Sequence, residues 1–71
     1  MKNLFEKMNS ETKAKFEKEK AKYPSIFYFL EEDLKENEYV GHLQFSTIVN
    51  LNNHGIIDTY MLHEINKLFN D

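Results

Sequence analysis

The nine residues LNNHGIIDT, from Leu51 to Thr59, hold the signals that decide how the middle of the chain folds. Gly55 suits the left-handed conformation that often follows the last turn of a helix, which makes His54 the C-cap residue. Leu51 and Ile56 then occupy the two positions whose side chains contact each other in a Schellman motif. This stretch therefore predicts that a helix ends at about residue 54.

A second helix signal follows within the same stretch. Asp58 occupies the position of an N-cap, and Ile57 and Leu62 occupy the two positions of a hydrophobic staple. We therefore expect a helix over residues 59–69. Its expected apolar face has Met61 at the edge and consists of Leu62, Ile65, Leu68 and Phe69.

The segment before these signals fits two kinds of secondary structure. Apolar and polar residues alternate from His42 to Leu51, as they do in a half-buried strand. The same segment also forms a helical stripe. Because two successive caps outweigh this alternation, we predict a helix over residues 40–54, with a short strand in place of part of it as the alternative. The members of the helical stripe are Val40, Leu43, Thr47, Ile48 and Leu51.

Pro24 precedes an aromatic stretch, SIFYFL, in the first half of the chain. Residues before a proline avoid the helical conformation, whereas proline itself suits the first turn of a helix. We therefore expect a helix over residues 25–36, on which Phe29 extends the core face and Tyr28 points the opposite way. That core face consists of Ile26, Phe27, Leu30 and Leu34.

The N-terminal segment predicts one long helix over residues 4–22, with Asn3 and Glu6 placed as a capping box. The stretch Asn9-Ser10-Glu11 also fits the start of a fresh helix. In that alternative, residues 1–8 form a separate turn or a loose arm. The apolar stripe of the segment consists of Phe5, Met8, Thr12, Phe16 and Tyr23.

These segments predict an all-α protein, a small bundle of three to four short helices in a single domain over residues 1–71. Glycine and proline are scarce, which favours helices joined by short connections. A chain of 71 residues buries a limited core. The absence of cysteine excludes disulfides and thiolate zinc sites, so oligomerisation is the remaining common source of extra stability.

Charge is divided unevenly along the chain, whose formal net charge is −3. Residues 1–23 hold seven lysines and four glutamates, a net of +3, whereas residues 24–71 hold two lysines and eight acids, a net of −6. The two parts are expected to meet within one chain or across a homodimer. No stretch approaches the ~18 apolar residues of a membrane span, and the N-terminus lacks a secretory apolar region. We therefore expect a protein of the bacterial or host-cell cytoplasm with no membrane partner.

The residue types that carry catalysis occur in settings that favour structural roles. The serines lie at expected helix starts, and the histidines are too far apart along the chain to form a metal pair on one helix. The paired carboxylates lie on a solvated face, where their pKa is not raised as general acid–base catalysis requires. We therefore expect no enzyme activity, no catalytic or metal-binding residue and no cofactor. The residues considered are Ser10, Ser25, Ser46, His42, His54, His63 and Glu31 to Asp33.

DNA binding is the alternative function. Residues 46–65 have the outline of a helix-turn-helix unit with Gly55 in the turn. The second helix of that unit carries one lysine, no arginine and several acids, so it would enter the major groove against the phosphate charge. Nucleic acid is therefore a less favoured partner than protein. The acids are Asp58, Glu64 and Asp71.

Protein binding is favoured because two of the expected helices are apolar on more than one side. A short bundle buries one stripe per helix, so further apolar residues are either central or available to a partner. Aromatic side chains are frequent anchors of protein interfaces. The candidate partner-binding residues are Tyr28, Phe29, Phe45, Val49 and Tyr60.

The sequence thus predicts a small non-enzymatic protein that binds a partner protein, another copy of itself, or both. A homodimer is the expected oligomer, and the expected role is that of an inhibitor, an adaptor or an assembly modifier. The small size and the composition, rich in lysine and asparagine, are typical of accessory proteins of phages and other mobile elements. That association is compositional and implies no mechanism.

Overall fold

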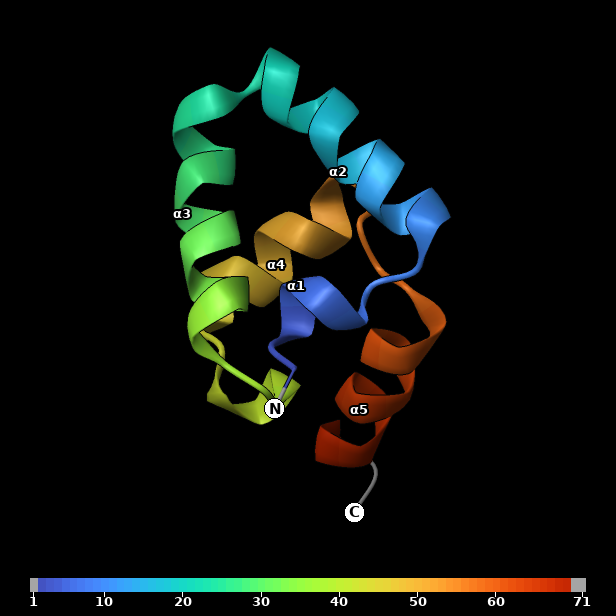
Figure 1. Cartoon of the computed structure of the whole chain (residues 1–71). Coiled ribbons are helices and arrows are strands. Elements are labelled where there is room, and N and C mark those ends of the chain that lie inside the picture. The colour runs from blue at the N-terminus through green and yellow to red at the C-terminus, as the bar shows by residue number, and fades with distance from the viewer. Residues whose placement is uncertain (1, 70–71) are drawn as a thin grey trace.

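Cap signals divide the chain into short helices, and no residue that the structure describes lies in a strand (Figure 1). The computed structural model describes the backbone of residues 2–69 and the side chains of residues 2–67. The predicted all-α class is confirmed. The elements are α1 (Leu4–Lys7), α2 (Ser10–Lys22), α3 (Pro24–Glu36), the 3₁₀ turn η1 (Val40–His42), α4 (Phe45–Asn53) and α5 (Thr59–Phe69).

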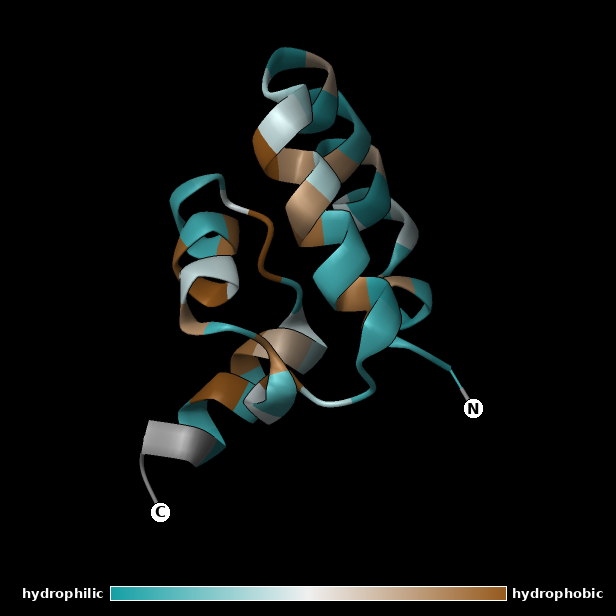
Figure 2. Ribbon diagram, turned by 90° about the vertical axis from the view of Figure 1, so that its left-hand side faces the viewer, coloured by the Kyte–Doolittle hydropathy of each residue, from teal (hydrophilic) through white to brown (hydrophobic). Residues whose placement is uncertain are grey.

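The helices are arranged around α3. Helices α2 and α3 form a hairpin that closes at Tyr23, at the top of Figure 1. Helix α3 also packs against α1 and α4, whereas α5 packs against η1. Figure 2 shows the hairpin on one side of the molecule and α4 and α5 on the other. Helix α3 therefore has neighbours from both halves of the chain.

The predicted single helix over residues 4–22 is wrong, because the structure divides it into α1 and α2 around Met8 and Asn9. The backbone of Asn9 is extended, and its side-chain oxygen accepts the Thr12 N–H at 2.8 Å. The Asn9 N–H donates to Asp58 Oδ2 at 2.9 Å rather than to a helical carbonyl. The predicted alternative, a fresh helix after Asn9, is the arrangement observed.

Helix α1 is a single turn that contributes to the core. Its predicted capping box is present: the Glu6 N–H donates to Asn3 Oδ1 at 2.9 Å, and the Asn3 N–H donates to Glu6 Oε1 at 3.3 Å. Leu4 and Met8 are buried. The Leu4 N–H also donates to the Asn37 carbonyl at 2.9 Å, which joins this turn to the end of α3.

Helix α3 begins at Pro24, one residue before the predicted start, and buries a narrower face than predicted. Phe27, Leu30 and Leu34 are buried, at i, i+3 and i+7. Ile26 is 41 % exposed, so its assignment to the core face is wrong. The physical reason is its position at the edge of the stripe, where it borders an open space between α3 and α4.

The predicted helix over residues 40–54 begins late, because η1 and an extended connection precede α4. The Leu43 N–H donates to the Val40 carbonyl at 3.0 Å, which closes a 3₁₀ turn. The next N–H, that of Gln44, donates to Asp33 Oδ2 on α3 at 3.0 Å. This contact with another helix separates η1 from α4. The alternative strand is not found in this described segment.

The predicted end of α4 is confirmed. The Ile56 N–H donates to the Leu51 carbonyl at 2.8 Å, and the Gly55 N–H donates to the Asn52 carbonyl at 3.1 Å, as in a Schellman motif. Gly55 has a φ of +71°, which side chains disfavour. Leu51 and Ile56 are both fully buried.

A series of ring contacts runs through the core from α1 to the end of α4. The Phe5 and Phe16 ring centroids are 5.3 Å apart, and those of Phe16 and Phe27 are 5.0 Å apart. The Phe27 and His54 ring centroids are also 5.0 Å apart. Edge-to-face geometry at these distances is favourable beyond the area that it buries. Four elements therefore share one aromatic cluster.

The apolar face of α5 is rotated relative to the prediction. Met61, expected at the edge, is 1 % exposed, whereas Leu62, expected at the centre, is 50 % exposed. The reason is that α5 packs against η1 and directs Met61 toward it and the core. The predicted face residues Leu68 and Phe69 lie outside the described side chains. No helix in the described part of the chain has the length and apolar character to cross a bilayer.

Candidate protein-binding grooves

The candidate partner-binding residues are all on the surface but do not form one site. Phe29 and Phe45 are 71 % and 72 % exposed, and Tyr28 is 59 % exposed. Val49 and Tyr60 are less exposed. Phe29 lines one groove, Val49 lines a second groove, and Tyr60 contacts Lys7.

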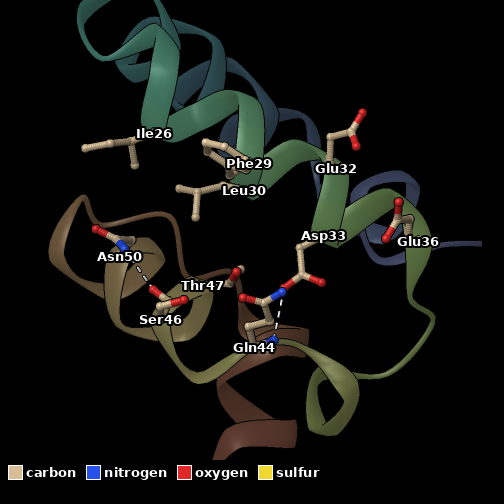
Figure 3. A pocket seen from close by; sticks show the side chains of 10 residues that line it. All are labelled: Ile26, Phe29, Leu30, Glu32, Asp33, Glu36, Gln44, Ser46, Thr47 and Asn50. Carbon is tan, nitrogen blue, oxygen red and sulfur yellow. Dashed lines mark hydrogen bonds between the residues drawn. The ribbon is translucent and has the colours of Figure 1, made fainter.

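The first groove lies between α3 and α4 and has a volume of about 390 Å³ (Figure 3). We call it the acidic groove because, among the side chains that the structure describes, three carboxylates and no basic group line it. Apolar side chains of α3 form one wall, and polar side chains of α4 and the residue before it form the other. Its lining consists of Ile26, Phe29, Leu30, Glu32, Asp33, Glu36, Gln44, Ser46, Thr47 and Asn50.

Hydrogen bonds of Asp33 set the relation between the two walls of the acidic groove. Asp33 Oδ2 accepts the Gln44 N–H at 3.0 Å, and Asp33 Oδ1 accepts Asn37 Nδ2 at 2.9 Å. The carboxylate of Asp33 is therefore used within the fold. Glu32 and Glu36 are exposed one helical turn apart, and neither takes part in an ion pair with a described residue. These two carboxylates are the charges that the acidic groove presents to a partner.

The second groove lies between α4 and α5 and has a volume of about 240 Å³. We call it the apolar groove, because Asn52 is the only polar residue among the described side chains that line it. The residues Ile57 and Leu62, expected to form a hydrophobic staple, both line it. Helix α4 thus separates two grooves of different character. The remaining lining residues are Ile48, Val49 and Ile65.

Tyr60, one of the candidate residues, has a contact within the chain. Lys7 Nζ lies 5.4 Å from the Tyr39 ring centroid and 5.2 Å from the Tyr60 ring centroid, in cation–π contact with both. The same ammonium donates to the Glu38 carbonyl at 3.0 Å. Tyr60 therefore helps to hold α1, α5 and the connection after α3 together.

His54 joins the end of α4 to α2. Its Nδ1 lies 3.0 Å from Glu19 Oε1, and both side chains are 17 % exposed. The Tyr23 and Phe27 rings flank the imidazole, with centroids 4.9 Å and 5.0 Å away. The hydrogen bond from His54 holds the pKa of Glu19 below its ordinary value of 4.5. In the described part of the chain, no three metal-binding side chains gather in one place.

Glu19→Gln is expected to reduce the loss of stability on acidification. Because the pKa of Glu19 is lowered by folding, its carboxylate stabilises the protein fully above the ordinary value of 4.5. That contribution is lost as the pH falls through the lower pKa of the folded state. The measurement is the free energy of unfolding in denaturant, taken at neutral pH and at a pH below the pKa values of the carboxyl groups. Glu17→Gln, an exposed change on the same helix, is the control. An unchanged pH dependence in Glu19→Gln would contradict this role.

One ion pair between the basic N-terminal part and the acidic remainder forms within the chain. Lys20 Nζ lies 3.1 Å from Glu31 Oε1, and Lys35 Nζ lies 3.4 Å from Glu31 Oε2. Burial acts to raise the pKa of Glu31, but the hydrogen bonds and charges of both lysines outweigh it and hold this pKa low. The hydrogen bond to Glu31 raises the pKa of Lys20. This pair joins α2 to α3.

The predicted helix-turn-helix unit over residues 46–65 corresponds to α4, a five-residue connection and the first part of α5. Asp58 is 5 % exposed, and its Oδ1 accepts the Tyr60 N–H at 2.9 Å, so it caps α5 as predicted. DNA binding remains a prediction. The comparisons with protein families, with curated proteins and with solved structures give no match to this chain.

Proposed function

We propose that this protein is a small non-enzymatic binding protein whose contacts with a partner protein are made on both sides of α4. The observation that supports this proposal is the pair of grooves flanking α4, each bordered by exposed apolar side chains. Phe29 borders the acidic groove, and Val49 and Leu62 border the apolar groove. The fitting roles are those of an inhibitor, an adaptor or an assembly modifier.

Helix α4 is short, yet it is used on three sides. Leu51 and Thr47 face the core and are buried. Ser46 and Asn50 line the acidic groove, and Val49 lines the apolar groove. A helix with grooves on both sides of its buried stripe leaves surface that side chains 2–67 do not cover, which favours a binding role. A second copy of the chain is one candidate partner.

The proposal is tested by comparing the wild type with Phe29→Ser and Val49→Ser. Light scattering gives the oligomeric state, and affinity capture from the native cell gives the partners. At least one variant is expected to lose a partner, or the dimer, while keeping wild-type circular dichroism. The control Ala21→Ser changes an exposed residue of α2 that lines neither groove. Equal oligomeric state and equal captured proteins in all four chains would contradict the proposal.

A further inference from the structure

We infer that the acidic groove binds a basic amphipathic helix of a partner protein. The inference rests on the proposed binding function and adds the chemistry of the partner. Its basis is the combination, in one groove, of an apolar wall and an acidic rim (Figure 3). Each part selects one face of the incoming helix.

The apolar wall selects an apolar face. Ile26 and Phe29 are 41 % and 71 % exposed on α3, beside the buried Leu30. Figure 3 shows the three side chains together along the part of α3 that borders the groove. Covering them removes apolar surface from water, which favours association. A purely polar ligand would leave this wall exposed.

The acidic rim selects positive charge. Glu32 and Glu36 lie at i and i+4 on α3, one turn beyond the apolar wall, and Asp33 lies between them. No basic side chain within residues 2–67 lines the groove to neutralise them. Lysine or arginine residues one turn apart on an incoming helix have matching spacing. The same charges oppose the phosphates of nucleic acids and of anionic lipid surfaces.

A helical ligand is favoured because the groove is bounded by two helices. A strand would need a free sheet edge, and the described residues contain no strand. An amphipathic helix satisfies its own backbone hydrogen bonds and presents only side chains, which is how helices bind in grooves between helices. Ser46 and Asn50 form the opposite, polar wall, which is compatible with the polar side of such a helix.

A second copy of the chain fits the groove less well. Helix α2 carries the largest group of lysines, but its only exposed apolar residues are Ala14 and Ala21. A neighbouring α2 would supply charge to the rim and no large side chain to the wall. The inference therefore commits to a different chain that carries both features on one helix.

The test uses three designed peptides and the full chain, with binding measured by fluorescence anisotropy. The first peptide carries leucine at i, i+3, i+4 and i+7 and lysine elsewhere. The second keeps the leucines and replaces each lysine with glutamate. The third has the composition of the first in an order without an apolar face. We expect the first peptide to bind at least tenfold more tightly than the other two, a difference of about 1.4 kcal/mol, and to weaken as salt is added.

Matched variants locate the binding site. Phe29→Ser and the double variant Glu32→Lys/Glu36→Lys are each expected to weaken binding of the first peptide roughly tenfold. Ala21→Ser and the double variant Glu11→Lys/Glu17→Lys change exposed residues of α2 outside the groove and are expected to bind as the wild type does. Circular dichroism and thermal unfolding check that each variant is folded.

The outcomes separate this inference from the proposed function. Equal binding of the lysine and glutamate peptides, or equal binding by the groove variants and their controls, would overturn the inference. So would a dimer that dissociates on Glu32→Lys/Glu36→Lys, because a second copy would then occupy the groove. If no peptide binds while Val49→Ser still loses a captured partner, the inference fails and the proposed function stands. If the capture and light-scattering results are also unchanged in every variant, both fail.

Discussion

Phe27→Ala is expected to lower the free energy of unfolding by about 3–5 kcal/mol. Phe27 is fully buried on α3, and its ring contacts those of Phe16 on α2 and His54 after α4. Removing it leaves a cavity where three segments meet. Because small domains have stabilities of roughly 5–15 kcal/mol, this loss is a large fraction of the total free energy of unfolding. Denaturant unfolding followed by circular dichroism measures the change.

The matched control is Phe29→Ala, the same substitution two residues later on the same helix. Phe29 is 71 % exposed, so its loss is expected to change stability by about 0.5 kcal/mol or less. A similar cost for the two variants would mean that α3 buries a different face. The same outcome would also remove the basis for assigning Phe29 to a binding surface.

Asp58→Ala is expected to lower the free energy of unfolding by roughly 2–3 kcal/mol. The Asp58 side chain is nearly buried and accepts two backbone N–H groups. One comes from Asn9, before α2, and the other from Tyr60, in the first turn of α5. Alanine leaves both donors without this partner, and each helix loses a favourable negative charge at its N-terminus. Thermal and denaturant unfolding measure the loss.

Asn9→Ala is the comparison for this variant. The Asn9 side chain accepts one N–H, that of Thr12, and is exposed, so its removal is expected to cost about 1 kcal/mol. Asp58→Asn keeps an uncharged acceptor and is expected to fall between the two alanine variants. A cost for Asp58→Ala no greater than that for Asn9→Ala would show that the contact with Asn9 contributes little.

Features of the fold that depend on neighbouring residues could be predicted from the sequence. The Schellman motif at Gly55, the cap at Asp58 and the capping box at Asn3 each involve residues within a few positions of one another. Proline at position 24 likewise marks the start of α3. Local hydrogen-bonding preferences determine such features, so a short window of sequence is sufficient to find them.

Features that depend on distant residues were missed. Helices α1 and α2 are separate partly because Asn9 donates to Asp58, and η1 is separate from α4 because Gln44 donates to Asp33. Periodicity alone does not reveal either contact. Ile26 has the correct spacing for the core, but it borders the acidic groove and stays 41 % exposed. Burial at the edge of a stripe depends on what packs against it.

Only part of the candidate site could be predicted from the sequence, because the rest depends on contacts between distant residues. Phe29 and Val49 were expected to be available because one buried stripe did not need them, and the structure places each in the lining of a groove. The polar wall, which includes Ser46 and Asn50, had no sequence signal, because it becomes a wall only when α4 packs beside α3. Leu62 was assigned to the core because its spacing does not show how α5 is rotated.

The carboxylate shared by two helix starts also bears on the order in which the chain gains structure. Asn9 and Asp58 are 49 positions apart, so Asn9 is synthesised well before its acceptor. Until then, the first N–H before α2 has only water as a partner. Closing so long a loop is slow compared with forming a single helix. We therefore expect the contact between Asn9 and Asp58 to form late in folding, after the single helices that it joins.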